Sequence, residues 1–166
     1  MTASPRRLAL VVPVYNEAEL VERSLPEILA RVRDAAAGAL VELIAVDDGS
    51  TDGTRESLLR LAAQQPEVRF ISFTRNFGKE AAIHAGLQVA METTQAEVVV
   101  VIDADLQHPP ELVASMLEHW RSGFKVVEGV KRERRHEGPL RRLAARIFYG
   151  LFSRLSGLRL DEDTDF

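Results

Sequence analysis

Apolar residues along this chain form two kinds of pattern, which alternate from the N-terminus onwards. Continuous apolar runs, typical of strands buried on both faces, cover residues 8–14, 41–46, 68–73, 97–102 and 125–130. Between them apolar residues recur at the spacing of amphipathic helices, in residues 17–37, 54–64, 78–92, 109–121 and 140–158. Strands that alternate with helices predict an α/β fold with a mostly parallel central sheet flanked by helices.

Turn and capping residues mark several of these boundaries. Asn16 is placed to cap the helix of residues 17–37, and Gly38 is placed to end it. The pair Pro109–Pro110 suits the first turn of the fourth predicted helix, where proline is tolerated. These residues support the boundaries that the apolar pattern predicts.

Composition narrows the class of protein. The 166 residues suffice for one domain with a sizeable core, and 46% hydrophobic with 28% charged residues is the balance of a globular protein. There is no cysteine, which excludes disulfides and thiolate metal sites. No apolar run approaches the roughly 18–20 residues that span a membrane. The motifs G-x-G-x-x-G, G-x-x-x-x-G-K-[ST] and G-x-S-x-G are absent, which argues against a dinucleotide oxidoreductase, a P-loop NTPase and an α/β-hydrolase.

Polar clusters follow each of the first four predicted strands. They are residues 15–17, 47–49, 75–79 and 103–105. Because ligands of parallel sheets bind at the carboxyl ends of the strands, we expect these clusters to converge on one edge of the sheet.

Asp103 and Asp105 are the first candidates for chemistry, because they follow the most apolar of the predicted strands. Two carboxylates two residues apart can share one divalent cation, and oxygen ligation suits Mg²⁺ or Mn²⁺. Such a cation can bridge the phosphates of a nucleotide diphosphate as that group leaves. Gln107 can supply a further oxygen, and His108 is a weaker candidate. The alternative is that these acids only complement the dipole of the following helix.

Three other loops at the same edge offer groups that suit a nucleotide. Asp48 can accept a hydrogen bond from a base or ribose, Tyr15 can stack on a base, and Glu17 can bond to a sugar hydroxyl. Lys79 adds positive charge at a predicted helix start, where free backbone N–H groups also favour phosphate. The alternatives are a turn and helix cap at residues 50–54, an aromatic ring covering the sheet edge, an acid in a first helical turn and a solvated lysine.

Positive charge is concentrated towards the C-terminus. The formal net charge is −4, but residues 131–159 contain nine Lys or Arg and two Glu, so the remainder is strongly acidic. Within residues 140–158 arginines flank an apolar helical face, a pattern that suits an interfacial helix on an anionic membrane. The alternative is an amphipathic helix that packs on the sheet.

Together and in this order, four segments resemble the family 2 glycosyltransferases, which have the Rossmann-like GT-A fold. The segments are VVPVYNE (11–17), VDDGSTDGT (46–54), RNFGKEAAIHAGL (75–87) and VIDADLQHPPEL (101–112). The resemblance extends over nearly the whole chain. The last two segments resemble in particular the branch of dolichol-phosphate mannose synthase and the bacterial polyprenyl-phosphate glycosyltransferases.

The resemblance implies roles for individual residues. Asp103 and Asp105 would hold Mg²⁺ or Mn²⁺, with Gln107 as a further ligand. The family has an arginine near the phosphates after the fifth strand, where this chain has Lys131, which would be catalytic together with the two aspartates. The residues implied to contact the nucleotide sugar are Pro13, Tyr15, Glu17, Val46, Asp48 and Ala104, with Arg132 beside the phosphates.

In this branch a nucleotide sugar donates its sugar to a lipid phosphate at the membrane surface. The resemblance therefore implies an inverting hexosyltransferase that moves a UDP- or GDP-linked sugar to polyprenyl phosphate at the cytoplasmic face of the membrane. A lipid phosphate is already anionic and needs little help from a general base, and the sequence shows no unassigned, well-placed base. Two alternatives remain: a family 2 enzyme with a glycan or polysaccharide acceptor, and a non-catalytic module that binds nucleotide sugar or membrane.

The chain departs from the family pattern at residues 163–166. The family often has a glycine before the closing Asp-Phe or Ser-Phe of a late loop, whereas this chain has Thr164 before Asp165 and Phe166. The role of Asp165 at the acceptor is therefore left undecided. The family continues into further catalytic sequence, and many bacterial members continue into membrane-spanning helices. We expect residues 1–166 to be the N-terminal, nucleotide-sugar-binding part of a longer catalytic domain.

Overall fold

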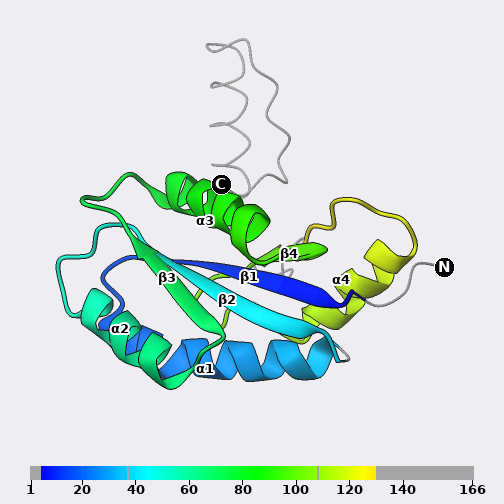
Figure 1. The fold of residues 1–166 in the computed structure, drawn as a ribbon, viewed down its shortest axis with the longest axis horizontal. Helices are drawn as coiled ribbons and strands as arrows, with labels where there is room; N and C mark the ends of the chain where they lie inside the picture. The colour runs from blue at the N-terminus through cyan, green and yellow to red at the C-terminus, as the bar shows by residue number, and fades with distance from the viewer. Residues whose placement is uncertain (1–4, 37, 108, 130–166) are drawn as a thin grey trace, which may run out of the picture. The chain divides into compact units, whose positions relative to one another are not determined.

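The computed structural model describes residues 5–36, 38–107 and 109–129. The strands are β1 (Arg7–Val14), β2 (Leu40–Asp47), β3 (Val68–Ser72) and β4 (Val98–Val101), and the helices are α1 (Ala18–Ala35), α2 (Thr54–Gln64), α3 (Lys79–Thr93) and α4 (Leu112–Arg121). Helices lie on both faces of the sheet (Figure 1). The predicted α/β fold with a parallel sheet is thereby confirmed.

The described sheet has the strand order β3-β2-β1-β4, and every neighbouring pair is parallel. β1 and β2 lie at its centre and pair along their full length, from Arg7 with Leu40 to Val14 with Asp47. All four strands therefore end at the same edge, and the loops that follow them are brought together there.

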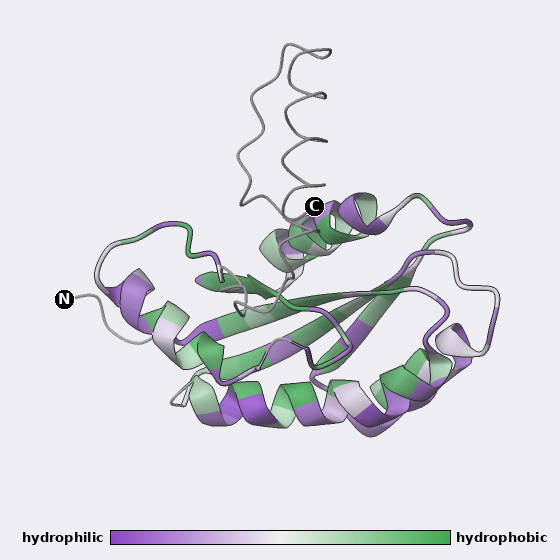
Figure 2. Cartoon of the chain, turned by 180° about the vertical axis from the view of Figure 1, so that it is seen from behind, coloured by the Kyte–Doolittle hydropathy of each residue, from purple (hydrophilic) through white to green (hydrophobic). Residues whose placement is uncertain are grey.

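Two hydrophobic layers enclose the sheet, because successive side chains of a strand point to opposite faces. In β1 the even-numbered residues, such as Leu10 and Val12, belong to the larger cluster with α1, α2 and α4. The odd-numbered Ala9 and Val11 belong to a smaller cluster with α3. Figure 2 shows that the central strands are mostly hydrophobic and that the helices carry both hydrophobic and hydrophilic residues. This is the pattern of a helix that buries one face.

Helix α3 lies very close to the sheet at a glycine. A Cβ atom added to Gly86 would lie 2.4 Å from Cγ1 of Val11 and 3.0 Å from Cγ2 of Val46. Ala82 and Ala90, one turn to either side of Gly86, are fully buried. This small-residue stripe sets the height of α3, and with it the position of the helix start beside the strand ends.

Three expectations about the elements were wrong. Asn16 does not cap α1. It has a positive φ of 53°, and the N-cap residue of this helix, Glu17, makes no capping hydrogen bond with its side chain. The predicted fourth strand is shorter than expected and only partly buried, because in the described part of the chain it pairs with β1 alone. Residues 125–129 of the predicted fifth strand form no strand, and Val126 is 86% exposed. None of the described strands pairs with this segment.

The fourth predicted helix begins later than expected. Pro109 and Pro110 form turns whose carbonyl groups accept hydrogen bonds from the N–H groups of Leu112 and Val113, and α4 begins at Leu112. The expected helix of residues 140–158 lies outside the described residues. Among the helices that the structure describes, none is long and apolar enough to cross a membrane.

Candidate active site

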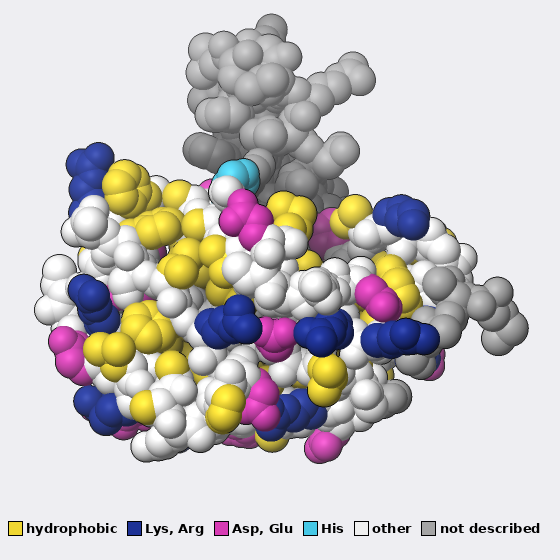
Figure 3. All heavy atoms as spheres, in the orientation of Figure 1, with side chains coloured by type: hydrophobic (Ala, Val, Ile, Leu, Met, Phe, Trp, Pro, Cys, Tyr) yellow, Lys and Arg dark blue, Asp and Glu magenta, His cyan; other side chains and the backbone are white. Residues whose placement is uncertain are grey.

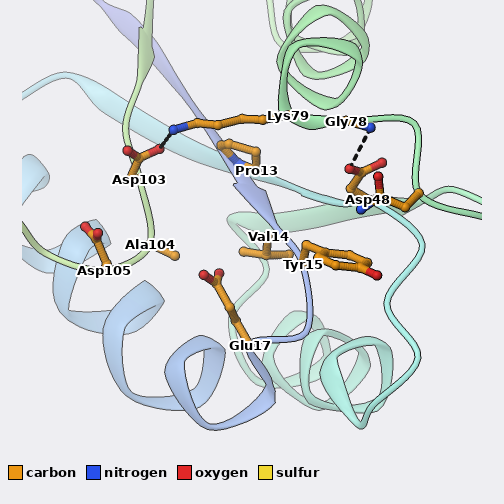
Figure 4. A pocket seen from close by; sticks show the side chains of 11 residues that line it. Pro13, Val14, Tyr15, Glu17, Asp48, Gly78, Lys79, Asp103, Ala104 and Asp105 are labelled. Atoms are coloured by element: carbon orange, nitrogen blue, oxygen red, sulfur yellow. Dashed lines mark hydrogen bonds and ion pairs between the residues drawn. The ribbon is translucent and has the colours of Figure 1, made fainter. Parts of the chain in front are cut away.

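A pocket of about 310 Å³ lies at the carboxyl edge of the sheet. Residues from all four loops line it, and Figure 4 shows them facing a common space. They are Pro13, Val14, Tyr15, Glu17, Asp48, Asn76, Gly78, Lys79, Asp103, Ala104 and Asp105. The expected convergence of the polar clusters on one edge is confirmed.

The loop after β1 is fastened to the loop after β2. The backbone N–H of Asn16 donates to Oγ of Ser50 at 2.9 Å, and Oδ1 of Asn16 accepts from the N–H of Thr51 at 2.8 Å. The N–H of Glu17 donates to Oγ1 of Thr54 at 2.8 Å. The positive φ of Asn16 turns the chain so that Tyr15, 44% exposed, and Glu17 both line the pocket.

Residues 50–54 also supply the cap that α1 lacks. Asp52 accepts hydrogen bonds from the N–H of Ala18, the first residue of α1, and from the N–H and hydroxyl of Thr54. The hydroxyl bond of Thr54 is the main cause of the lowered pKa of Asp52. The expected turn and helix-cap role of this segment is present, and it serves both α1 and α2.

Asp48 is buried and holds the start of α3. Its carboxylate accepts hydrogen bonds from the N–H of Phe77 at 2.7 Å and from the N–H of Gly78 at 2.9 Å (Figure 4). The neighbouring Gly49 has a positive φ of 70°, and a Cβ there would lie 2.2 Å from the carbonyl carbon of Arg75. The two loops therefore meet backbone to backbone, and a carboxylate at a helix N-terminus suits the helix dipole.

Three carboxylates gather on the other side of the pocket. Figure 4 shows Glu17 pointing towards Ala104 and Asp105, which belong to the loop after β4. Burial raises the pKa of Glu17, and the negative charges of Asp105 and Asp103 raise it further. Lys79 contacts this group of acids, with its Nζ atom 2.7 Å from Oδ1 of Asp103. Proximity of like charges in a partly buried site is favourable only when a cation is near.

The oxygen donors of Asp103 and Asp105 fit Mg²⁺ or Mn²⁺, since both residues line the pocket. In the described part of the chain no group of three His, Cys, Asp or Glu residues is arranged to hold a metal by itself. The pair would therefore bind a cation together with oxygens from a ligand. Such shared ligation is the usual way for Mg²⁺ to be held beside phosphates.

Most of the predicted site residues meet in this pocket, and a few do not. The side chain of Val46 is fully buried and packs beside Gly86 of α3, and Val46 does not line the pocket. Gln107 is exposed and does not line the pocket; its N–H donates to Oδ1 of Asp105 at 2.9 Å. Lys131 and Arg132 lie outside the described residues.

Three lining residues were not among the predicted site residues, although the sequence marked Gly78 as a helix start with free N–H groups: Val14, Asn76 and Gly78. Asn76 and Gly78 belong to the polar cluster of residues 75–79, which the sequence does mark. The sequence does not indicate which residues of this cluster line the pocket. Arg75 and Phe77, by contrast, form a cation–π contact of 4.7 Å beside it. The direction in which each side chain of a loop points depends on its tertiary contacts, which the local sequence does not reveal.

The glycosyltransferase profile described as "Glycosyl transferase family 2" matches residues 9–164. The chain belongs to this family. The matched range includes every loop of the pocket, so the candidate site lies within the family's common sequence.

Two relatives illustrate the similarity. The chain is 41% identical over 156 residues to an uncharacterized glycosyltransferase of Bacillus subtilis (strain 168), covering 94% of this chain and 46% of the relative. It is 37% identical over 159 residues to an undecaprenyl-phosphate 4-deoxy-4-formamido-L-arabinose transferase of Edwardsiella ictaluri (strain 93-146), covering 93% of this chain and 46% of the relative. The chain thus spans about half the length of these curated relatives.

Among solved structures, the fold is similar to a mannosyltransferase from Pyrobaculum calidifontis in complex with GDP-Man and Mn²⁺. The TM-score is 0.57 at 28% sequence identity, and the match covers 91% of this chain and 39% of the other. The GT-A fold expected from the sequence is thereby confirmed.

Proposed function

We propose that this chain is the donor-binding part of a glycosyltransferase that moves a sugar from a nucleotide diphosphate sugar to a polyprenyl phosphate. The observation that supports this most is the pocket itself, in which Tyr15, Lys79 and the Asp103–Asp105 pair meet at the carboxyl edge of the sheet. A relative named for undecaprenyl phosphate and a structural neighbour in complex with GDP-Man and Mn²⁺ support the two substrate classes.

The donor would lie across the pocket from loop to loop. The exposed ring of Tyr15 offers a stacking surface for the base, and Glu17 is placed for a sugar hydroxyl. Asp48 already accepts two backbone hydrogen bonds, so it would contact the base through its remaining lone pairs. Asp103 and Asp105 would hold Mg²⁺ or Mn²⁺, which neutralises the charge of the diphosphate when bound.

Transfer would then be a single displacement. An oxygen of the lipid phosphate attacks the anomeric carbon of the sugar, and the bond from that carbon to the diphosphate oxygen breaks with its electron pair leaving on the diphosphate. Attack opposite the leaving group inverts the anomeric configuration. No proton must be removed from an anionic acceptor. In this protein Lys79, with Lys131 and Arg132, would stabilise the departing charge electrostatically.

With a membrane lipid as the proposed acceptor, the reaction would take place at a membrane surface, and we propose the cytoplasmic face. The basic residues 131–159 and the apolar helical pattern of residues 140–158 suit contact with anionic lipid.

A transfer assay with the complete catalytic domain, of which this chain is proposed to be the donor-binding part, tests the proposal. Radiolabelled UDP-glucose or GDP-mannose is offered with Mn²⁺ and polyprenyl phosphate, with neutral polyprenol and an oligosaccharide as competing acceptors. We expect label in the lipid phosphate and loss of transfer in Asp103→Asn. Label in the oligosaccharide instead would identify a glycan-acceptor enzyme.

The same assay separates lipid contact from chemistry. With the acceptor in anionic vesicles, Arg142→Glu with Arg146→Glu is expected to lower transfer, and with the acceptor in detergent the same variant is expected to match the wild type. Equal transfer by the variant in vesicles would overturn the proposed role of the basic helix.

A further inference from the structure

Lys79 is the single cationic side chain among the described residues that line the pocket. Its ammonium group is held in an ion pair. Its Nζ atom lies 2.7 Å from Oδ1 of Asp103 (Figure 4), with 55% and 31% of the two side chains exposed. The ammonium group therefore already occupies one oxygen of the carboxylate pair that fits a divalent cation.

The position of Lys79 in its helix is not one that favours a lysine. It is the first residue of α3, where the helix dipole is positive and a cation is unfavourable. Asp48 lies at the same helix start, but its two carboxylate oxygens accept hydrogen bonds from the N–H groups of Phe77 and Gly78. The carboxylates of Asp103, Asp105 and Glu17 are the groups that offset this cost, since they line the same pocket and Asp103 contacts Lys79 directly.

The negative charge around Lys79 supports the same reading. Glu17 experiences the charges of Asp105 and Asp103, which raise its pKa, and the charge of Lys79, which lowers it. Among the described residues, one lysine thus shares the pocket with four acids, Glu17, Asp48, Asp103 and Asp105. The pair is partly exposed, so it is weak, and a stronger cation can displace the ammonium group at little cost.

We infer that Lys79 is a built-in counterion of the metal site: it occupies Asp103 in the donor-free protein and moves to the diphosphate when donor and metal bind. This inference rests on the proposed function, and it adds how the binding of the metal and the binding of the nucleotide depend on each other. The metal alone must compete with Lys79 for Asp103, whereas a metal–nucleotide complex brings diphosphate oxygens that accept the displaced ammonium group. Metal and nucleotide are then expected to bind cooperatively.

The long, flexible side chain of lysine suits this exchange. Its ammonium group is a compact point charge on a four-carbon stem, so it can reach either an aspartate or a phosphate from a fixed backbone. A purely structural ion pair would stay in place when the ligand binds. The two roles predict different effects of replacing Lys79 on the affinity for the metal in the absence of nucleotide.

The test measures Mn²⁺ binding from the electron paramagnetic resonance signal of free Mn²⁺, first without nucleotide. Lys79→Gln is expected to bind Mn²⁺ about two- to tenfold more tightly than the wild type, because the competing charge is gone. In saturating Mn²⁺ the same variant is expected to bind UDP and GDP several-fold more weakly, because the diphosphate has lost its ammonium partner. Lys79→Arg is expected to keep Mn²⁺ binding near the wild-type level.

Lys125→Gln is the matched control, since it removes the same charge from an exposed lysine outside the pocket. It is expected to leave both affinities unchanged. Unchanged or weaker Mn²⁺ binding in Lys79→Gln, with nucleotide binding intact in the wild type, overturns the counterion role alone. If the wild type binds neither UDP nor GDP with Mn²⁺, the proposed function falls and this inference falls with it.

Discussion

At the scale of single residues, Glu17 shows how a binding pocket can work against stability. Its carboxyl group is partly buried and lies near Asp105 and Asp103, and burial raises its pKa, with those two acids adding to the effect. The folded protein therefore holds a proton at Glu17 more readily than the unfolded chain does. Ionisation of Glu17 at neutral pH consequently lowers the free energy of unfolding.

Replacing Glu17 with glutamine tests this. A group with a raised folded-state pKa contributes stability while protonated, and that contribution is lost as the pH rises through the folded-state pKa. Glu17→Gln is therefore expected to raise Tm by about 1–3 °C near neutral pH, and the difference is expected to shrink at about pH 4. Thermal unfolding followed by circular dichroism measures both values. Glu56→Gln, an exposed change outside the pocket, is the control, and a difference independent of pH would refute the explanation.

Single residues also show where the sequence stops being informative. The aspartates and Tyr15 could be placed at the pocket because each directly follows an apolar run. The hydrogen bonds and ion pairs of the pocket residues could not be predicted from the sequence. Asn16 looks like a helix cap locally, but it bonds to Thr51 from the next loop, and Lys79 looks solvated but pairs with Asp103. Both partners are distant in sequence, so no local pattern records them.

At the scale of elements, the packing of α3 on the sheet decides where the pocket's cation lies. Gly86 and its buried neighbours Ala82 and Ala90 allow this helix to approach β1 closely. The same helix begins at Lys79, so its height above the sheet fixes the distance from Lys79 to the loop after β4. A helix held further out would separate the charges that meet in the pocket.

Gly86→Ala probes this packing. In an exposed helix interior the change would stabilise by about 1 kcal/mol. Here the new methyl group would meet Cγ1 of Val11, so we expect destabilisation of about 1–3 kcal/mol. Urea unfolding measures it. Adding Val11→Ala to this variant is expected to cost less than the sum of the two single changes, because the clash is relieved. A stabilised Gly86→Ala variant would show that the helix does not lie this close.

Elements differ in how far the sequence predicts them. β1 and β2 were predictable because each is a long apolar run with neighbours on both sides, and α2 was predicted with its observed bounds. Residues 125–129 were wrongly predicted as a strand, because Val126 and Val127 supply β-propensity but no strand among the described residues pairs with them. Strand formation depends on a partner, which a local run cannot reveal.

At the scale of the whole molecule, charge is distributed unevenly between surface and pocket. Figure 3 shows basic and acidic side chains interspersed on the face in view. Exposed pairs such as Arg33–Glu67 and Arg31–Glu111 balance one another and contribute at most about 1 kcal/mol each. In the pocket, by contrast, a single lysine stands against four acids among the described lining residues, Glu17, Asp48, Asp103 and Asp105. This local excess of negative charge is what a cation-loaded diphosphate would complement.

The most direct test of the account is isothermal titration of this chain with UDP-glucose and with GDP-mannose, with and without Mn²⁺. We expect one of the two donors to bind at least tenfold more tightly when Mn²⁺ is present, and Asp105→Asn to lose that gain. Asp34→Asn, an exposed change on α1, is expected to keep it. Donor binding that does not depend on Mn²⁺ and is unchanged in Asp105→Asn would contradict the assignment of this pocket as a metal-assisted nucleotide-sugar site.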